Sequence, residues 1–134
     1  MTRTATTSPI RTATACVAIA LGVLATPVQA QLVEIQWDAS DAFERSLMLA
    51  PAKFVEVCGK LRKGQSIDWS FTGQSPLNFN IHYHEGKKVV FPAKHDHAES
   101  LSGKLTVPAD QDYCWMWENK SDASASIALR MRRD

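Results

Sequence analysis

The four histidines of the sequence lie close together as two His-x-His pairs, His82 with His84 and His95 with His97. Successive side chains of a β-strand point to opposite faces, so residues two apart stand side by side on one surface. A chain reversal at residues 85–87 would bring all four imidazoles into one region. Because imidazole is a common ligand of transition metals, we predict a copper or zinc site. The alternative is a polar surface on which the histidines are incidental.

Neighbouring side chains offer further ligand chemistry. Glu85, Asp96 and Glu99 could ligate a metal or orient an imidazole. The thioethers of Met48 and Met116 suit Cu(I), although packing is the simpler interpretation of both. The sequence contains no Gly-x-Ser-x-Gly motif, no phosphate-binding P-loop and no His-Glu-x-x-His motif. With no nucleophile placed beside a base, we predict that the protein is not an enzyme.

The N-terminal 30 residues have the pattern of an export signal. Arg3 and Arg11 precede an apolar run over residues 16–25, which is too short for a bilayer span of about 20 residues. A proline and small residues follow up to Ala30. We therefore predict a signal peptide over residues 1–30, a single mature domain over residues 31–134 and a periplasmic or secreted location. The alternative is that the N-terminal segment stays attached as an anchor.

If the protein is exported, the number of its cysteines and their oxidation state change. Of the three cysteines, Cys16 would leave with the signal peptide, and the mature chain would keep Cys58 and Cys114. An even number of cysteines in an oxidising compartment predicts a disulfide. Such a link would contribute about 4 kcal/mol in the chain-entropy model. Two free thiols, available as metal ligands, are the alternative.

The charge and hydropathy of the chain limit its partners. A formal net charge of +1 gives no electrostatic reason to expect binding to nucleic acid. No second long apolar segment follows the signal, so we expect no transmembrane segment in the mature chain. The expected partners are a metal ion or another protein of the cell envelope.

Alternating apolar residues predict an all-β domain. Trp69 and Phe71 share one strand face, and residues 77–84 alternate strictly. A loop over residues 73–76, a short strand ending at Pro92 and a polar stretch over residues 95–102 complete the middle of the chain. About eight short strands separated by turns predict an antiparallel β-sandwich, resembling a jelly roll. Six aromatic side chains should dominate its core: Trp69, Phe71, Phe79, Tyr83, Trp115 and Trp117.

A set of spaced residues resembles a known module. These are Cys58, Trp69, Phe71, Phe79, Ile81, Gly103, Tyr113, Cys114 and Asn119. Their order over residues 53–133 is similar to that of the GOLD (Golgi dynamics) β-sandwich. The resemblance implies a disulfide that bridges two sheets, an Asn-containing turn after the second cysteine, and a general binding role. The four histidines are not part of the GOLD pattern, so the resemblance says nothing about a metal.

The sequence thus leads to two functional predictions. The first is an exported small protein that binds copper or zinc through His82, His84, His95 and His97. The second is a non-catalytic envelope module that binds a protein partner.

Overall fold

The computed structural model describes residue 2 and residues 30–134, and those residues form seven β-strands. The all-β class is therefore confirmed. None of the described residues forms a helix that could cross a membrane. Apart from residues 2 and 30, the predicted signal peptide lies outside the described residues. The strands are β1 (Gln31–Glu34), β2 (Ala42–Leu49), β3 (Phe54–Leu61), β4 (Ser66–Glu85), β5 (Lys88–Thr106), β6 (Gln111–Glu118) and β7 (Ala125–Arg133).

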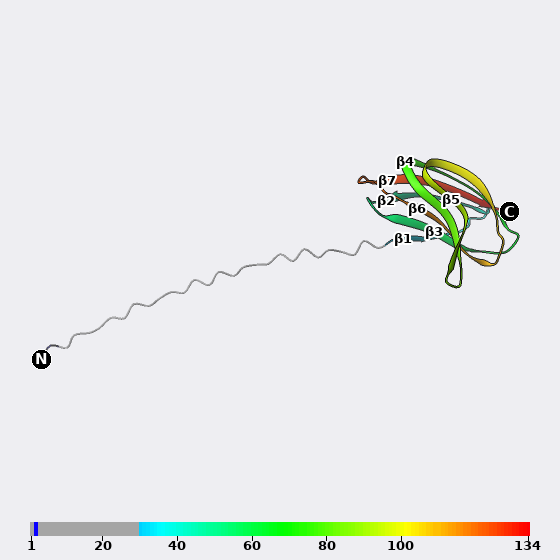
Figure 1. Ribbon diagram of the computed structural model, residues 1–134, viewed down its shortest axis with the longest axis horizontal. Helices are drawn as coiled ribbons and strands as arrows, with labels where there is room; N and C mark the ends of the chain where they lie inside the picture. The colour runs from blue at the N-terminus through cyan, green and yellow to red at the C-terminus, as the bar shows by residue number, and fades with distance from the viewer. Residues whose placement is uncertain (1, 3–29) are drawn as a thin grey trace.

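The strands form one curled sheet in the order β1-β3-β6-β4-β7-β2, with β5 paired to β4 outside this path (Figure 1). All pairings are antiparallel except that of β1 with β3. The result resembles a half-barrel of mixed strands. It differs from the predicted antiparallel sandwich in that one pair is parallel and the sheet is continuous.

The sheet is continuous because β4 belongs to both of its halves. Residues 67–73 of β4 pair with β7, and residues 78–82 pair with β6. Between these segments the register shifts, and β5 follows β4 on its other side along both segments. The strand therefore changes partner without ending, and this change lets the sheet curl around a single core.

Two long strands explain why the structure has seven strands and not the predicted eight. The predicted loop over residues 73–76 lies within β4, which is 20 residues long, and Pro92 lies within β5, which has 19. Proline cannot donate a ladder hydrogen bond, but it is tolerated on edge strands and at bulges. Within the part of the chain that the structure describes, β5 pairs only with β4 and is such an edge strand.

The core consists of the inward-facing side chains of this curled sheet. The six aromatic residues predicted to dominate it are all buried, with exposed fractions of 7 % or less. Phe79 packs between Trp69 and Trp117, with ring centroids 5.0 and 5.3 Å away. Phe71 lies on Phe79 from the other half of β4, at 4.9 Å. These contacts join the β7 half of the sheet to the β6 half.

Asn119 stabilises the corner where β6 ends. Its side chain is fully buried, and its Nδ2 donates to the carbonyl oxygens of Leu49, Ala50 and Ala123. Its Oδ1 accepts from both the backbone nitrogen and the hydroxyl of Ser121. A buried amide is costly unless its hydrogen bonds are made, and here they connect the end of β2 with the turn before β7.

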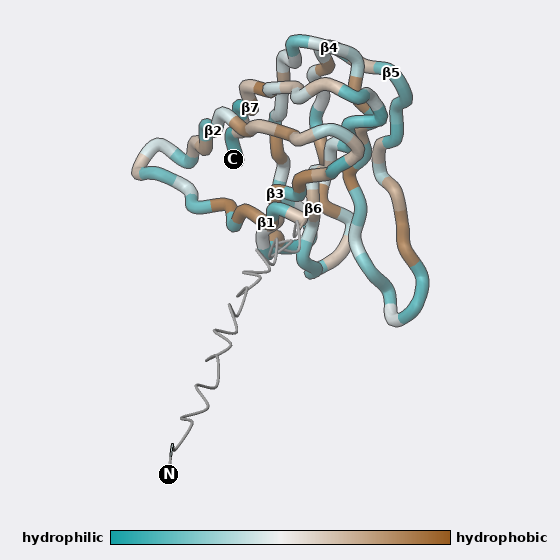
Figure 2. The backbone as a smooth tube through the Cα atoms, turned by 90° about the vertical axis from the view of Figure 1, so that its left-hand side faces the viewer, coloured by the Kyte–Doolittle hydropathy of each residue, from teal (hydrophilic) through white to brown (hydrophobic). Residues whose placement is uncertain are grey.

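The hairpin of β4 and β5 projects from the body of the fold (Figure 1). Its loop has two residues, and Gly86 occupies the first position with a φ of 59°. Glycine at that position suits the type II′ turn that matches the twist of a hairpin. The hydrophilic tip is followed on β5 by a hydrophobic stretch (Figure 2), which corresponds to residues 89–91.

Candidate functional site

The candidate site is a groove of about 470 Å³ on the outer face of the sheet. Side chains from β3, β4, β5 and β6 line it. The strands alternate between faces, so the residues between the buried aromatics of β4 and β6 point outward. His82 lies opposite Cys114 in the ladder, and Asn80 lies opposite Met116. The floor of the groove is thus the polar side of the same strands that supply the core.

His82 is buried even though it is on the outer face. Only 7 % of the residue is exposed, and the ring of Phe91 on β5 lies 6.0 Å from its ring. Its Nδ1 lies 2.8 Å from the Oδ1 of Asn80. Its Nε2 lies 3.6 Å from Oε1 of Glu56. The imidazole is therefore oriented by an amide on one side and faces a carboxylate on the other.

The surroundings of His82 keep it neutral. Burial lowers the pKa of His82 below the ordinary histidine value of 6.5 because the charged imidazolium loses hydration. The carboxylate of Glu56 opposes this effect, and His84 adds to it in a minor way. A neutral imidazole has one nitrogen with a free lone pair, which can accept a hydrogen bond or bind a metal.

His84 belongs to the same groove. It follows His82 by two positions on β4, and the two rings are 5.5 Å apart in an edge-on arrangement. Unlike His82, it is exposed. The structure therefore brings together the first predicted histidine pair. The ring of His82 is held by its contacts, whereas the ring of His84 is exposed and can rotate.

One member of the second predicted pair, His95, faces the other side of the sheet. His95 is opposite Phe79 in the ladder, and residues opposite one another point to the same face of the sheet. Since Phe79 points into the core, His95 leaves the sheet on the face opposite His82 and is exposed at the edge. His97 has a left-handed φ of 54°, and its backbone nitrogen donates to Asn78. The reversal between β4 and β5 therefore does not gather the four imidazoles at one point, contrary to the geometry expected from the sequence.

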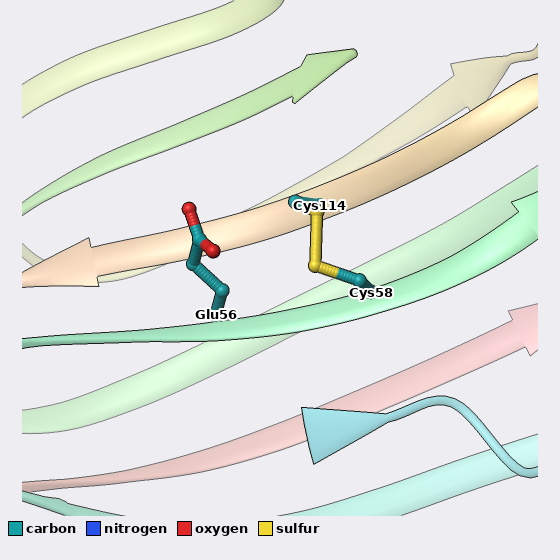
Figure 3. Close-up of side chains that lie close together, drawn as sticks. All are labelled: Glu56, Cys58 and Cys114. Carbon is teal, nitrogen blue, oxygen red and sulfur yellow. A yellow bond between two sulfur atoms is a disulfide. The ribbon is translucent and has the colours of Figure 1, made fainter. Parts of the chain in front are cut away.

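Only one group of three ligand-type residues has its ligand atoms within 4.8 Å of one another among the described residues, and it consists of Glu56, Cys58 and Cys114. The two cysteines form the predicted disulfide, which is confirmed. Figure 3 shows Glu56 beside this disulfide. Disulfide sulfurs are not thiolates, so this group lacks the ligands that a metal would need.

The disulfide joins neighbours within the sheet. Cys58 and Cys114 face each other across β3 and β6. The GOLD resemblance implies a bridge between two sheets, and the structure differs from it in this respect. The link lies in the row that ends at His82, so it holds together the strands under the groove.

Exposed hydrophobic side chains line one wall of the groove. Val89 and Phe91 are 38 % and 48 % exposed. Lys94 lies over the ring of Phe91, with its Nζ 5.5 Å from the ring centroid. From the sequence, residues 89–91 belong to the predicted short strand that ends at Pro92, with no functional role. Three consecutive apolar residues in a strand must put at least one on the outer face, and this signal could have identified the wall.

The chemistry available in the groove favours binding. Its lining contains imidazoles, carboxylates, amides and apolar groups, and it includes no serine, threonine or cysteine. The pair of His82 and Glu56 resembles the base and orienting acid of hydrolases, but the described groove places no hydroxyl or thiol beside it.

No protein-family model matches the sequence, and no curated protein matches it. Solved structures share the fold. PliG from Aeromonas hydrophila, a periplasmic inhibitor of g-type lysozyme, has a TM-score of 0.64 and 13% identity, covering 79% of this chain and 98% of its own. PliG from Salmonella Typhimurium has a TM-score of 0.61 and 13% identity, covering 79% and 100%. The pre-peptidase C-terminal domain of a Bacillus anthracis collagenase has a TM-score of 0.55 and 10% identity, covering 80% and 98%. At these identities the likeness establishes a shared β fold.

Proposed function

We propose that this protein is an exported, non-catalytic module that binds a protein partner in the periplasm. The observation that carries the proposal is the projecting β4–β5 hairpin, which exposes Val89 and Phe91 beside a polar groove. The shared fold with periplasmic inhibitors supports it, as does the export signal expected at residues 1–30. The groove lining, which lacks a hydroxyl or thiol nucleophile, supports a binding role over catalysis.

The hairpin is suited to contact another protein without promoting self-association. Among the described strands β5 pairs with β4 alone, so its outer edge offers backbone groups to a partner. Natural proteins protect such edges with lysine, proline and bulges. β5 has all three, in Lys94, Pro92 and the register shift between Ile81 and Tyr83 of its partner strand. Specific contact is then left to the exposed side chains beside the edge.

The tip of the hairpin is basic. Lys87 follows Gly86 in the turn, and Lys88 begins β5. Glycosidases such as lysozyme use a pair of carboxyl groups in their cleft. A projecting basic tip is complementary to such an acidic cleft, and the PliG structures are described as inhibitors of g-type lysozyme. We therefore propose a g-type lysozyme as the partner, with the hairpin tip entering its cleft.

The test combines inhibition and affinity. The purified protein is added to a g-type lysozyme, cell-wall lysis is followed, and affinity is measured by surface plasmon resonance. Replacing both Val89 and Phe91 with serine should weaken binding roughly tenfold or more, because exposed aromatic anchors dominate such contacts. Replacing Lys87 and Lys88 with glutamate should slow association, most strongly at low salt.

The matched control is Met48→Ser. Met48 is 63 % exposed and lies on β2, away from the hairpin, so its replacement should leave inhibition unchanged. Full lysozyme activity at a large excess of the protein would overturn the proposed partner. A photo-crosslinker placed at Phe91 in cells then tests the wider proposal, which fails if the hairpin captures no envelope protein.

A further inference from the structure

Three side chains with metal-ligand chemistry meet at one end of the groove. His82 and His84 come from β4, and Glu56 comes from β3. The strand between them, β6, contributes Cys114 and Met116 to the outer face. The carboxylate of Glu56 reaches across β6 toward the imidazole of His82. Two imidazoles and one carboxylate are a donor set that catalytic zinc sites use.

The hydrogen bond of His82 determines which of its nitrogens is free. The amide oxygen of Asn80 can only accept, so the Nδ1 that contacts it at 2.8 Å carries the proton. The lone pair is then on Nε2, which faces Glu56. Histidines that bind metals almost always donate their other N–H to an oxygen, which fixes the tautomer and the ring orientation. The ring is buried and has this arrangement already.

The separation of the two donor atoms fits a shared ion. Nε2 of His82 and Oε1 of Glu56 are 3.6 Å apart, too far for a good hydrogen bond. Two tetrahedral ligands with metal bonds of 2.0–2.2 Å are about 3.4 Å apart. The two atoms therefore lie close to the distance at which one ion would bind both.

His84 supplies the third donor after a rotation of its side chain. Its ring centroid is 5.5 Å from that of His82, on the same face of β4. In the present rotamer its nitrogens are not within 4.8 Å of both other donor atoms. Because the residue is exposed, its ring can turn toward the ion without displacing core side chains.

We propose that His82, His84 and Glu56 form a binding site for a divalent transition-metal ion, with Cu(II) bound more tightly than Zn(II). The order follows from the general affinity series for nitrogen and oxygen ligands. Asn80 acts as a positioning residue that holds the imidazole of His82 in the competent tautomer. The proposal leaves out His95, because the ladder places it on the face of the sheet opposite His82. It also leaves out His97, whose left-handed φ of 54° takes it out of the regular alternation of the strand.

The experiment is isothermal titration of the untagged, chelator-stripped protein with Cu(II) and then Zn(II). One equivalent of Cu(II) should bind with sub-micromolar affinity. Glu56→Gln and His84→Ala should each weaken binding at least tenfold. Both residues are at least partly exposed, so these variants should fold. His82→Asn should abolish the site, and circular dichroism checks that this variant keeps its strands.

The matched control replaces His95 and His97 together with alanine, which removes two imidazoles from the same hairpin, one more than any of the site variants. It should leave affinity unchanged. The proposal would be overturned if the control lost as much metal affinity as the site variants, or if only the control lost affinity. Either result would mean that the metal binds to histidines dispersed over the surface. The proposal is also overturned if no heat is observed for either metal.

Electron paramagnetic resonance of the Cu(II) form identifies the donors directly. The spectrum should show two coupled nitrogens in the original protein and one in His84→Ala. Asn80→Ala should weaken binding tenfold or more while the two-nitrogen spectrum is kept, as expected for a residue that only orients a ligand. A spectrum that does not change with His84→Ala would contradict the assigned donor set.

Discussion

Residues 67–73 of β4 lie between β5 and β7, whereas residues 78–82 lie between β5 and β6. Both segments bury alternate apolar side chains in the same core. Their outward faces differ, because Asp68 and Thr72 are exposed on the first segment while His82 is buried on the second. The difference arises from β5, which places Phe91 against His82. The outward face of one strand can thus be solvated along one segment and functional along the next.

The same contrast separates the two halves of the sheet. In the β7 half, outward charges form exposed pairs, such as Asp68 with Lys104 at 3.3 Å. In the β6 half, the outward row contains a disulfide and an oriented histidine. Strand periodicity therefore determines which residues are buried in the core. The chemistry of the outer face depends on what the neighbouring strand covers.

The largest expected effect comes from removing the disulfide of the groove half. Cys58→Ala with Cys114→Ala should lower the free energy of unfolding by about 4 kcal/mol, the chain-entropy value for this loop. Chemical unfolding measures the loss, and Ser46→Ala on β2 is the control. Amide hydrogen exchange should accelerate more in β3 and β6 than in the β7 half of the sheet. Uniform acceleration in both halves would contradict the assignment of the link to the groove half.

The next effect concerns the β7 half, where Gly103 lies opposite Trp69. A Cβ at Gly103 would lie 2.6 Å from Cζ2 of Trp69, a buried ring that cannot easily move. Gly103→Ala should therefore cost about 1–3 kcal/mol by overpacking. Ser102→Ala, one position along, should be close to neutral. Equal thermal midpoints for the two variants would show that the ring adjusts.

A pH dependence of stability should come from the buried histidine of the groove half, His82. Because burial lowers the pKa of His82 in the folded protein, the unfolded chain binds the proton more tightly. The contribution of His82 to the free energy of unfolding should be fully present above pH 6.5, the ordinary histidine pKa. It should decline as the pH falls from 6.5 toward the lowered pKa of His82. Chelator-treated protein is unfolded at several pH values. His82→Gln should flatten this part of the profile. Identical profiles for the original protein and His82→Gln would exclude His82 as the cause.

The smallest effect is expected for the exposed ion pair of the β7 half. Both side chains of the Asp68–Lys104 pair are more than half exposed. Such pairs contribute about 0–1 kcal/mol, and salt screens them. A double-mutant cycle with Asp68→Ala and Lys104→Ala should give a coupling energy in this range that falls in 1 M salt. A larger, salt-independent coupling would mean that this face is less solvated than its exposure indicates.

Much of the scaffold could be predicted from the sequence. Alternation over residues 77–84 correctly separated the core aromatics from the outward polar residues, because the periodicity of a strand is local. The cysteine count predicted the disulfide. Strand number was harder, since Pro92 usually ends a strand and is tolerated here only because β5 is an edge.

The candidate site could be predicted only in part. The pairing of His82 with His84 follows from their spacing on one strand. The separation of His95 from them depends on the register between β4 and β5, which places it opposite a core residue, Phe79. The contact of His82 with Glu56 spans β6 and depends on the order of strands in the sheet. Neither register nor strand order can be read from local periodicity.

The strand order also has a consequence for how the protein is made. Among the described strands, β2 has one neighbour in the sheet, and this is β7, the last of them in chain order. During synthesis from the N-terminus, β2 is complete long before its partner exists. Until β7 has been made, β2 has an unpaired hydrogen-bonding edge. Its side chains Phe43 and Leu47, which are buried in the finished fold, then remain exposed. Closure of the sheet therefore requires residues 125–133, and a chain that lacks them exposes a strand prone to pair with other molecules.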